Sequence, residues 1–210
     1  IPEVDAILGT TAIDEIVDTV EKVLAKKPEN HIEDINKTPV YGKKRVVTTG
    51  GHFAYLKIAD GCNNRCTYCA IPSIRGNYRS REIDDIIDEA KQLAEKGVKE
   101  LIVVAQDTTL YGKDIYQRLA LPELLKKLAE IDGIHWIRML YCYPDEFTDE
   151  LIETIATEPK ILHYIDLPLQ HADDKILKAM NRRGTQEQVK ELIAKLRSKI
   201  PDIVIRTTFI

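Results

Sequence analysis

The sequence predicts an α/β fold with a parallel sheet and outer helices, in the form of a full or partial (β/α) barrel. From residue 53 to the end of the chain, five apolar segments of strand length alternate with amphipathic segments of helical length. Such alternation is typical of right-handed βαβ units. The second and fourth apolar segments are nearly continuous, as expected for strands buried on both faces. No Gly-x-Gly-x-x-Gly turn follows the first strand, which disfavours a dinucleotide-binding sheet and favours a barrel.

The first 50 residues predict an approach segment that precedes this alternation. Apolar residues recur at helical spacing between positions 13 and 24. Thr10 or Thr11 can cap that helix, and lysines follow at its end. Residues 28–52 are polar and contain Gly42, Gly50 and Gly51, so they predict a linker or a short hairpin.

The alternation opens with a strand at Phe53–Ala59. A helix is predicted over residues 81–96, where one face is apolar and the first turn is acidic. Ser80 is its expected N-cap, and Gly97 is the residue expected to end it. Leu101–Ala105 is the next strand.

The middle of the chain continues the same pattern. A helix over residues 122–131 begins with Pro122, which suits the first turn of a helix. The third strand is predicted at His135–Tyr141 and the next helix at 149–157, with Thr148 as its N-cap.

The last part of the chain predicts a fourth strand, two helices and a fifth strand. The fourth strand is Ile161–Leu169, and helices follow at about 173–181 and at 186–199. The second of these helices begins with a Thr185-x-x-Gln188 capping box. Ile203–Phe209 is the fifth strand.

Composition and charge exclude several classes of protein. The 210 residues include 30 Lys and Arg against 34 Asp and Glu, a net charge of −4, and 44 % hydrophobic residues. These values exclude collagen-like, disordered and coiled-coil chains. No apolar run approaches the roughly 18 residues that a membrane span needs. Because no basic region precedes an apolar segment, we expect no signal peptide. We therefore expect a cytoplasmic protein that does not bind membranes; because the sequence begins with Ile1 rather than Met, we expect a fragment of a longer chain.

Three of the four cysteines lie within eight residues, with the spacing Cys62-x3-Cys66-x2-Cys69. In a chain that is neither short nor secreted, this clustering predicts a metal or iron–sulfur site rather than disulfides. Cys62 directly follows the first strand, at the end where functional loops of a barrel lie. Three thiolates suit a cubane cluster with one open iron. Zinc would need a fourth ligand, for which only His52 and Cys142 are available; we expect Cys142 to be a packed thiol.

The cysteine spacing, with an aromatic residue before the third cysteine, resembles the radical S-adenosylmethionine (radical SAM) superfamily. Neighbouring segments are similar to the methylthiotransferases of that superfamily. These segments are Asp60-Gly61-Cys62-Asn63, Cys69-Ala70-Ile71-Pro72, Arg75-Gly76, Arg79-Ser80-Arg81, Leu167-Pro168-Leu169-Gln170 and Leu177-Lys178-Ala179-Met180-Asn181-Arg182. The resemblance covers about residues 53–210 and implies a partial TIM-like barrel of the radical SAM type.

The resemblance also implies a specific chemistry. Cys62, Cys66 and Cys69 would hold a 4Fe-4S cluster whose open iron binds the amino and carboxylate groups of S-adenosyl-L-methionine. One electron, from a donor such as flavodoxin, would then generate a 5′-deoxyadenosyl radical that takes hydrogen from an unactivated carbon. Sulfur is inserted there, and a second S-adenosylmethionine supplies the methyl group; the cofactors carry this chemistry, and the protein orients them.

Five further residues are candidates for cofactor binding. Gln106 and Asp107 follow the second strand, where superfamily members often bind the methionine amine; a polar turn is the other interpretation. Arg138 and Arg206 lie within apolar strands and need partners, which can be a cofactor carboxylate or solvent. Gln170, at the end of the fourth strand, is expected near the nucleoside or substrate by family analogy.

Several residues near the predicted site stay open between two interpretations. Arg75, Arg79 and Arg81 flank the cysteine cluster and either hold cofactor or substrate or face solvent. Tyr141 and Tyr143 either line the barrel mouth or pack in the core or at the rim.

The substrate is suggested by the segment Gln106-Asp107-Thr108-Thr109-x-Tyr111-Gly112-x-Asp114. It resembles the methylthiotransferase branch that modifies a ribosomal protein, whereas the transfer-RNA branch typically carries Gln-Asn at the first two positions. We therefore expect methylthiolation of the β-carbon of an aspartate in a small-subunit ribosomal protein. An adenosine of transfer RNA is the alternative substrate, and a zinc-stabilised nucleic-acid-binding module is the alternative from another class.

The chain also departs from the methylthiotransferases that it resembles. Those proteins normally carry an amino-terminal domain with a second 4Fe-4S cluster and a small carboxyl-terminal β-barrel domain. We expect residues 1–50 to be the tail of that first domain with its linker, and residues 51–210 to be the radical SAM domain, cut within strand five. Such a fragment should have an open, apolar sheet edge and should not complete methylthiolation by itself.

Overall fold

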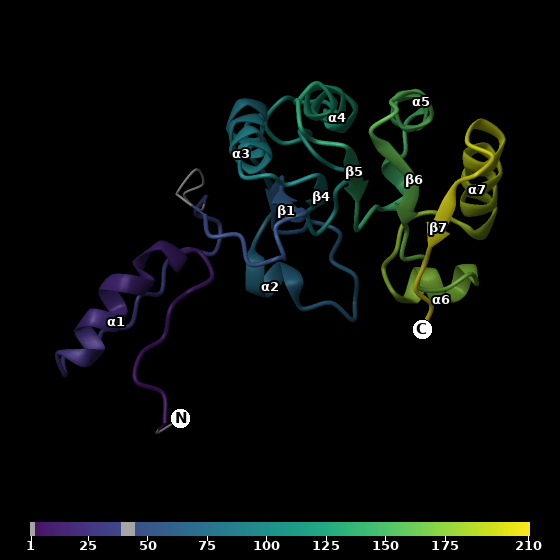
Figure 1. The fold of residues 1–210 in the computed structure, drawn as a ribbon. Coiled ribbons are helices and arrows are strands. Elements are labelled where there is room, and N and C mark those ends of the chain that lie inside the picture. Colours follow the sequence, from purple (N-terminus) through teal and green to yellow (C-terminus); the bar gives the residue numbers. More distant parts are fainter. Residues whose placement is uncertain (1–2, 39–44) are drawn as a thin grey trace.

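The structure, a computed structural model, describes residues 3–38 and 45–210. Its main sheet has five parallel strands in the order β1-β4-β5-β6-β7. The strands are β1 (Phe53–Lys57), β4 (Glu100–Val104), β5 (Trp136–Met139), β6 (Ile161–Asp166) and β7 (Val204–Arg206). Figure 1 shows them side by side in sequence order, with the helices α3, α4 and α5 above and α7 at the right, beside β6 and β7. The predicted parallel sheet and partial barrel are confirmed.

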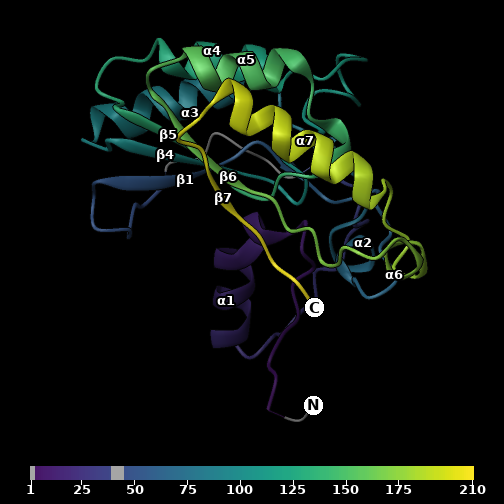
Figure 2. The ribbon, with the colours of Figure 1, turned by 90° about the vertical axis from the view of Figure 1, so that its right-hand side faces the viewer.

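Helices cover one face of this sheet and bury its apolar side chains. They are α3 (Ile83–Glu95), α4 (Leu121–Ala129), α5 (Asp149–Thr157) and α7 (Gln186–Lys199). Because successive strand residues point to opposite faces, Leu56, Leu101 and Ile137 are fully buried in the core. Tyr55 and Trp136 belong to the other face and are exposed, and Figure 2 shows that this face carries no covering layer of helices.

Two of the helix N-caps predicted from the sequence are present, because no distant group binds the capping side chain instead. The Thr148 side chain accepts a hydrogen bond from the Leu151 N–H, and Thr185 forms its capping box with Gln188. Ser80, however, does not cap α3. Its hydroxyl donates to Asp114 Oδ1 at 2.6 Å, so Glu82 takes the N-cap position instead.

Three short elements lie between β1 and α3 that the sequence did not predict. They are β2 (Ala59–Asp60), α2 (Ile71–Arg75) and β3 (Arg79–Ser80). The strands β2 and β3 pair antiparallel, so the segment between them forms a closed excursion. All three clustered cysteines lie on this excursion, and α6 (Asp174–Ala179) lies at the same end of the molecule as α2 in Figure 2.

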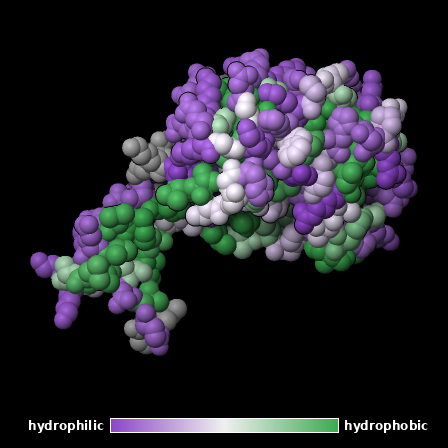
Figure 3. Space-filling model, viewed as in Figure 1, coloured by the Kyte–Doolittle hydropathy of each residue, from purple (hydrophilic) through white to green (hydrophobic). Residues whose placement is uncertain are grey.

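The residues before β1 form more than a linker. The predicted helix is present as a 3-10 turn, Ile13–Glu15, followed by α1 (Ile16–Leu24). The expected cap is wrong, because the Thr10 and Thr11 hydroxyls donate to distant carbonyls and no side chain caps either element. An isolated β-bridge pairs His31, after α1, with Leu8, before it. Gly42 lies outside the described residues. Figure 3 shows exposed apolar side chains over α1, which projects away from the sheet.

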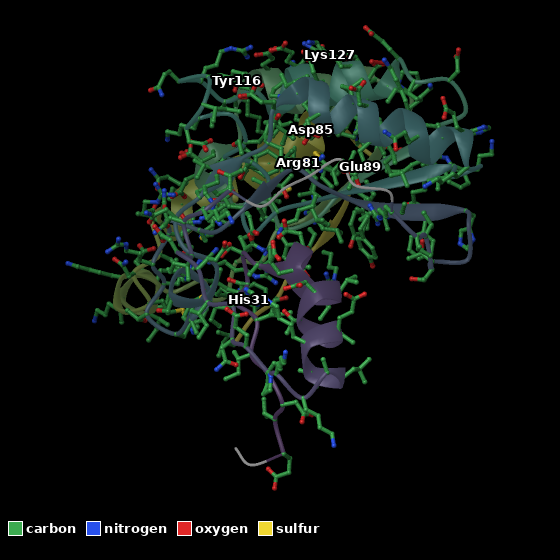
Figure 4. All side chains as sticks on the ribbon, turned by 90° about the vertical axis from the view of Figure 1, so that its left-hand side faces the viewer. His31, Arg81, Asp85, Glu89, Tyr116 and Lys127 are labelled. Carbon is green, nitrogen blue, oxygen red and sulfur yellow. The ribbon has the colours of Figure 1, made fainter. Side chains whose placement is uncertain are left out.

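Arg81 is a buried cation whose side chain joins β1 to α3. Its Nε donates to Asp85 Oδ2 at 2.8 Å, and its Nη1 donates to Glu89 Oε2 at 2.6 Å and to the Lys57 carbonyl at 2.7 Å. Figure 4 shows the three labelled side chains together at the start of α3. Neither interpretation from the sequence holds for Arg81, because this side chain is packed inside the domain rather than facing solvent or a cofactor.

Across residues 3–38 and 45–210, no helix is both long and apolar enough to cross a membrane.

Candidate functional site

The three clustered cysteines line one cavity at the carboxyl ends of the strands. This cavity has a volume of about 190 Å³ and is lined by Cys62, Cys66 and Cys69. A neighbouring cavity of about 340 Å³ shares Cys62 and Cys69, together with Gln106 and Tyr141. A larger cavity of about 760 Å³ lies between α3 and α4, but no cysteine lines it. The carboxyl-end position predicted for the cysteines therefore coincides with two adjoining spaces that can receive a cofactor.

The cysteine loop, residues 61–69, is shaped by its own backbone. Gly61 has φ +77°, in the left-handed region, and turns the chain out of β2. The Cys62 N–H donates to the Gly76 carbonyl at 3.2 Å, and the Cys69 N–H donates to the Cys66 carbonyl at 3.0 Å. The start of the loop is thus hydrogen-bonded to the segment that leads into β3, and the loop makes a tight turn between its second and third cysteines.

A second loop, residues 180–185 between α6 and α7, holds the cysteine loop from outside. The Thr67 N–H donates to the Met180 carbonyl at 3.0 Å, and the Asn181 side chain donates to the Arg65 carbonyl at 2.9 Å. Arg183 Nη2 also donates to Asn64 Oδ1 at 2.7 Å. These contacts join residues more than 110 positions apart in the sequence, and no local pattern predicts them.

Asp107 anchors the cysteine loop from inside. Its Oδ2 accepts from Asn64 Nδ2 at 2.8 Å, and its Oδ1 accepts from Thr109 Oγ1 at 2.8 Å. The side chain is almost fully buried, and this burial raises the pKa of the carboxyl. Since protein donors occupy both oxygens, the structure places Asp107 behind the cavity, whereas its neighbour Gln106 lines it.

Gln106 presents an unsatisfied acceptor at this cavity. Its Oε1 is buried and has no hydrogen-bond partner within residues 3–38 and 45–210. Buried polar atoms without partners are uncommon in folded proteins and call for a donor from a ligand or water. An ammonium or hydroxyl group bound beside the cysteines would supply that donor.

The two arginines predicted from the strands both have partners within the chain. Arg206 Nη1 lies 3.0 Å from Asp166 Oδ1, while Asp166 Oδ2 accepts from the Tyr141 N–H at 3.1 Å. Arg206 is therefore linked to Tyr141, in the cavity wall, through the buried carboxylate of Asp166. Arg138 Nε donates to Glu100 Oε1 at 2.6 Å, and because Glu100 begins β4, this pair is at the end of the sheet opposite to the cysteines. The sequence suggested a cofactor carboxylate as the partner of Arg138. In the structure, the carboxylate of Glu100 is its partner.

The remaining candidates divide between cavity wall and core. Gln170 lines the cysteine cavity, and its backbone has φ +70°. Tyr141 and Tyr143, left open by the sequence, also line it, and so does Arg182, which sequence reasoning missed. Cys142 touches the same wall but is 2 % exposed, so the expected packed thiol is confirmed. For the two tyrosines, the one feature of the sequence that indicated a place at the cavity was their position at the end of the third predicted strand.

The donor set fits an iron–sulfur cluster better than a single ion. The three cysteines are free and half-buried. Burial, with the nearby charges of Asp107, Cys66 and Cys69, raises the pKa of the Cys62 thiol. In the part of the chain that the structure describes, no three His, Cys, Asp or Glu side chains converge as ligands of one metal ion do. Three thiolates around an open space could bind three irons of a cubane cluster and leave the fourth iron open to another ligand.

Burial predicts which thiols react with an alkylating agent when no cluster is bound. We expect Cys66 and Cys69 to be modified first, because both are partly accessible. Cys62 should react more slowly, since its raised pKa lowers the thiolate fraction. Cys142 should react only after unfolding, because burial raises its pKa much further. Iodoacetamide labelling followed by peptide mass mapping measures this order, and fast labelling of Cys142 would contradict it.

Comparisons with known proteins identify the family of this chain. The model of the radical SAM superfamily matches residues 56–210. A protein of Lachnoclostridium phytofermentans named ribosomal protein uS12 methylthiotransferase RimO is 53 % identical over 210 residues, covering 100 % of this chain and 48 % of that protein. The protein of the same name from Clostridium tetani is 50 % identical over 210 residues, covering 100 % of this chain and 47 % of that protein. This chain thus spans about half the length of the curated relatives it matches.

Two solved structures share the fold at low sequence identity. The radical S-adenosylmethionine methyltransferase TsrM from Kitasatospora setae, with cobalamin and a [4Fe-4S] cluster bound, has a TM-score of 0.60 and 18 % identity, covering 75 % of this chain and 30 % of that chain. The cobalamin-dependent S-adenosylmethionine radical enzyme OxsB has a TM-score of 0.64 and 12 % identity, covering 95 % of this chain and 32 % of that chain. At these identities the likeness concerns the fold alone.

Proposed function

Since this chain belongs to the radical SAM superfamily, with 155 of its residues, 56–210, matching the family model, we propose that it is the radical-generating part of a methylthiotransferase. Cys62, Cys66 and Cys69 would hold a 4Fe-4S cluster. The observation that carries the proposal is the cavity that all three cysteines line, with the buried Gln106 Oε1, which has no partner among the described residues, beside them.

In this proposal, the residues that line the cavity and those that lie behind it have different roles. Gln106 Oε1 accepts a hydrogen bond from the amino group of S-adenosylmethionine, and Gln170 contacts the nucleoside or the substrate. Asp107 keeps the cysteine loop in place through Asn64, and Arg206 supports Tyr141 through Asp166. Tyr141 and Tyr143 exclude water from the reacting atoms. When bound, the cluster and S-adenosylmethionine supply the one-electron chemistry that activates a carbon–hydrogen bond.

The proposed substrate is an aspartate of ribosomal protein uS12, modified at its β-carbon. Two relatives with ribosomal protein uS12 in their names match the whole chain at 53 % and 50 % identity, which disfavours transfer RNA. The net charge of −4 is also suited to a basic ribosomal protein rather than to polyphosphate.

The remaining parts of the proposal concern the rest of the protein. Residues 1–50 would be the tail of a preceding domain that holds a second 4Fe-4S cluster, and residues 51–210 would be the radical SAM domain. A one-electron donor such as flavodoxin would reduce the cluster held by the three cysteines. A ribosomal substrate would place the reaction in the cytoplasm.

Parallel incubations with two substrates test the proposed activity. The full-length protein, reconstituted without oxygen, is given a uS12 peptide that contains the aspartate in one reaction and transfer RNA in another. We expect a mass gain of about 46 Da, one SCH₂ unit, on the peptide and none on the RNA. The matched control replaces that aspartate by Asn in the peptide. A gain on transfer RNA alone would overturn the substrate and leave the radical chemistry in place.

A further inference from the structure

Arg182 is a cation whose guanidinium contacts the cysteine loop. It lies in the loop between α6 and α7, and its Nη2 donates to the Pro168 carbonyl at 2.7 Å. Its Nη1 lies 3.3 Å from the Tyr68 hydroxyl and 4.0 Å from Cys66 Sγ. The guanidinium carbon also lies 4.4 Å from the centre of the Tyr143 ring. One side chain therefore joins the cysteine loop to the loops that follow β5 and β6.

The geometry fixes the guanidinium in place. A planar fork with one arm on a carbonyl and one face on an aromatic ring has little rotational freedom left. The next residue, Arg183, also lies over the Tyr143 ring, but at 5.5 Å, and its charge is offset by Asp145. Two neighbouring arginines thus hold the same tyrosine, and only Arg182 turns toward a cysteine sulfur.

The Arg182 guanidinium forms no direct ion pair with a carboxylate of the described residues, although its charge acts on nearby Asp145. Among the ion pairs of residues 3–38 and 45–210, none includes Arg182. Its contact with Cys66 is partly buried, where charges act on each other more strongly than in water. A cation without a direct ion pair among the described residues, facing a sulfur ligand, is therefore well placed to stabilise negative charge on that sulfur.

We propose that Arg182 is a positioning residue that raises the reduction potential of the cluster held by Cys66 and its two partners. This inference rests on the proposed function. Reduction adds one electron from the donor to the cluster, so its negative charge grows by one. The Arg182 guanidinium favours that more negative state, because positive charge and hydrogen bonds at the sulfurs raise the potential of iron–sulfur clusters. Its contacts with Pro168 and Tyr143 keep it at the required place.

A redox titration of variants, followed by electron paramagnetic resonance, tests the proposal. Arg182→Met removes the charge and the donors while keeping an extended side chain. We expect the ratio of reduced to oxidised cluster at a given potential to fall about tenfold, which is about 59 mV for a one-electron couple. Arg182→Lys keeps the charge and should lie between Arg182→Met and the wild type. The matched control is Lys178→Ala, which removes a charge from exposed α6 near the same loop and should leave the potential unchanged.

Iron content separates failure of this inference from failure of the proposed function. The Cys62→Ala, Cys66→Ala, Cys69→Ala triple variant identifies the resonance signal that belongs to this site. If wild-type protein shows no iron that these cysteines hold, the proposed function fails. If the cluster is present and Arg182→Met keeps the wild-type potential at full iron content, the inference is overturned. An Arg182→Lys potential no closer to the wild type than that of Arg182→Met, or an equal shift in Lys178→Ala, overturns it as well.

Discussion

Replacing Cys62, Cys66 and Cys69 together by Ala should abolish the binding of about four irons per chain. The reason is that all three side chains line the same cavity, and a cubane cluster that loses its three thiolates keeps no ligand from the protein. Anaerobic reconstitution followed by iron and sulfide assays measures the loss. Iron that stays bound to the triple variant would contradict the assignment of the three cysteines.

Cys142→Ala is the matched control for that experiment. Cys142 touches the wall of the same cavity but is 2 % exposed and belongs to the hydrophobic core. Its removal should cost some stability through a small cavity and should leave the iron content unchanged. A zinc assay on the same samples addresses the zinc-stabilised alternative, because zinc in place of iron and sulfide would favour it.

The fold could be predicted from the sequence because its signals are local. Apolar periodicity gave the five strands and the main helices, and the Thr148 cap and the Thr185 capping box depend on residues within one turn. Ser80 was misassigned because its partner, Asp114, is 34 residues away. The pair β2 and β3 was missed for a related reason, since two-residue strands carry no periodicity.

The site divides in the same way between local and distant signals. The spacing of the three cysteines lies within one loop, so it could be read directly. Arg182 could not be assigned, because its contact with Cys66 spans 116 positions. Arg138 lies in an apolar strand as noted, but the sequence does not indicate that Glu100, on the neighbouring strand, meets its charge. Long-range pairing therefore decided which polar residues face the cavity.

Gly61→Ala should be the most disruptive single-methyl change in the cysteine loop. Gly61 has φ +77°, and a Cβ there would lie 2.0 Å from the Asn77 carbonyl oxygen and 2.7 Å from the Gly76 carbonyl oxygen. Both neighbours are backbone atoms of the segment that pairs with Cys62, so they cannot move aside without opening the loop. We expect a loss of about 3–5 kcal/mol in the free energy of unfolding, from left-handed strain and the clash together. Urea denaturation measures this loss, and iron content after reconstitution should fall with it.

Gly97→Ala separates the clash from the backbone strain. Gly97 follows α3 with φ +90°, yet a Cβ there would meet nothing within 4 Å. Its substitution should therefore cost only the left-handed strain, about 1–2 kcal/mol, and the variant should bind as much iron as the wild type. Equal losses in the two variants would mean that the carbonyls of Gly76 and Asn77 do not confine the cysteine loop. A larger loss in Gly61→Ala, with iron binding lost in that variant alone, would show that the turn out of β2 determines where Cys62 is placed.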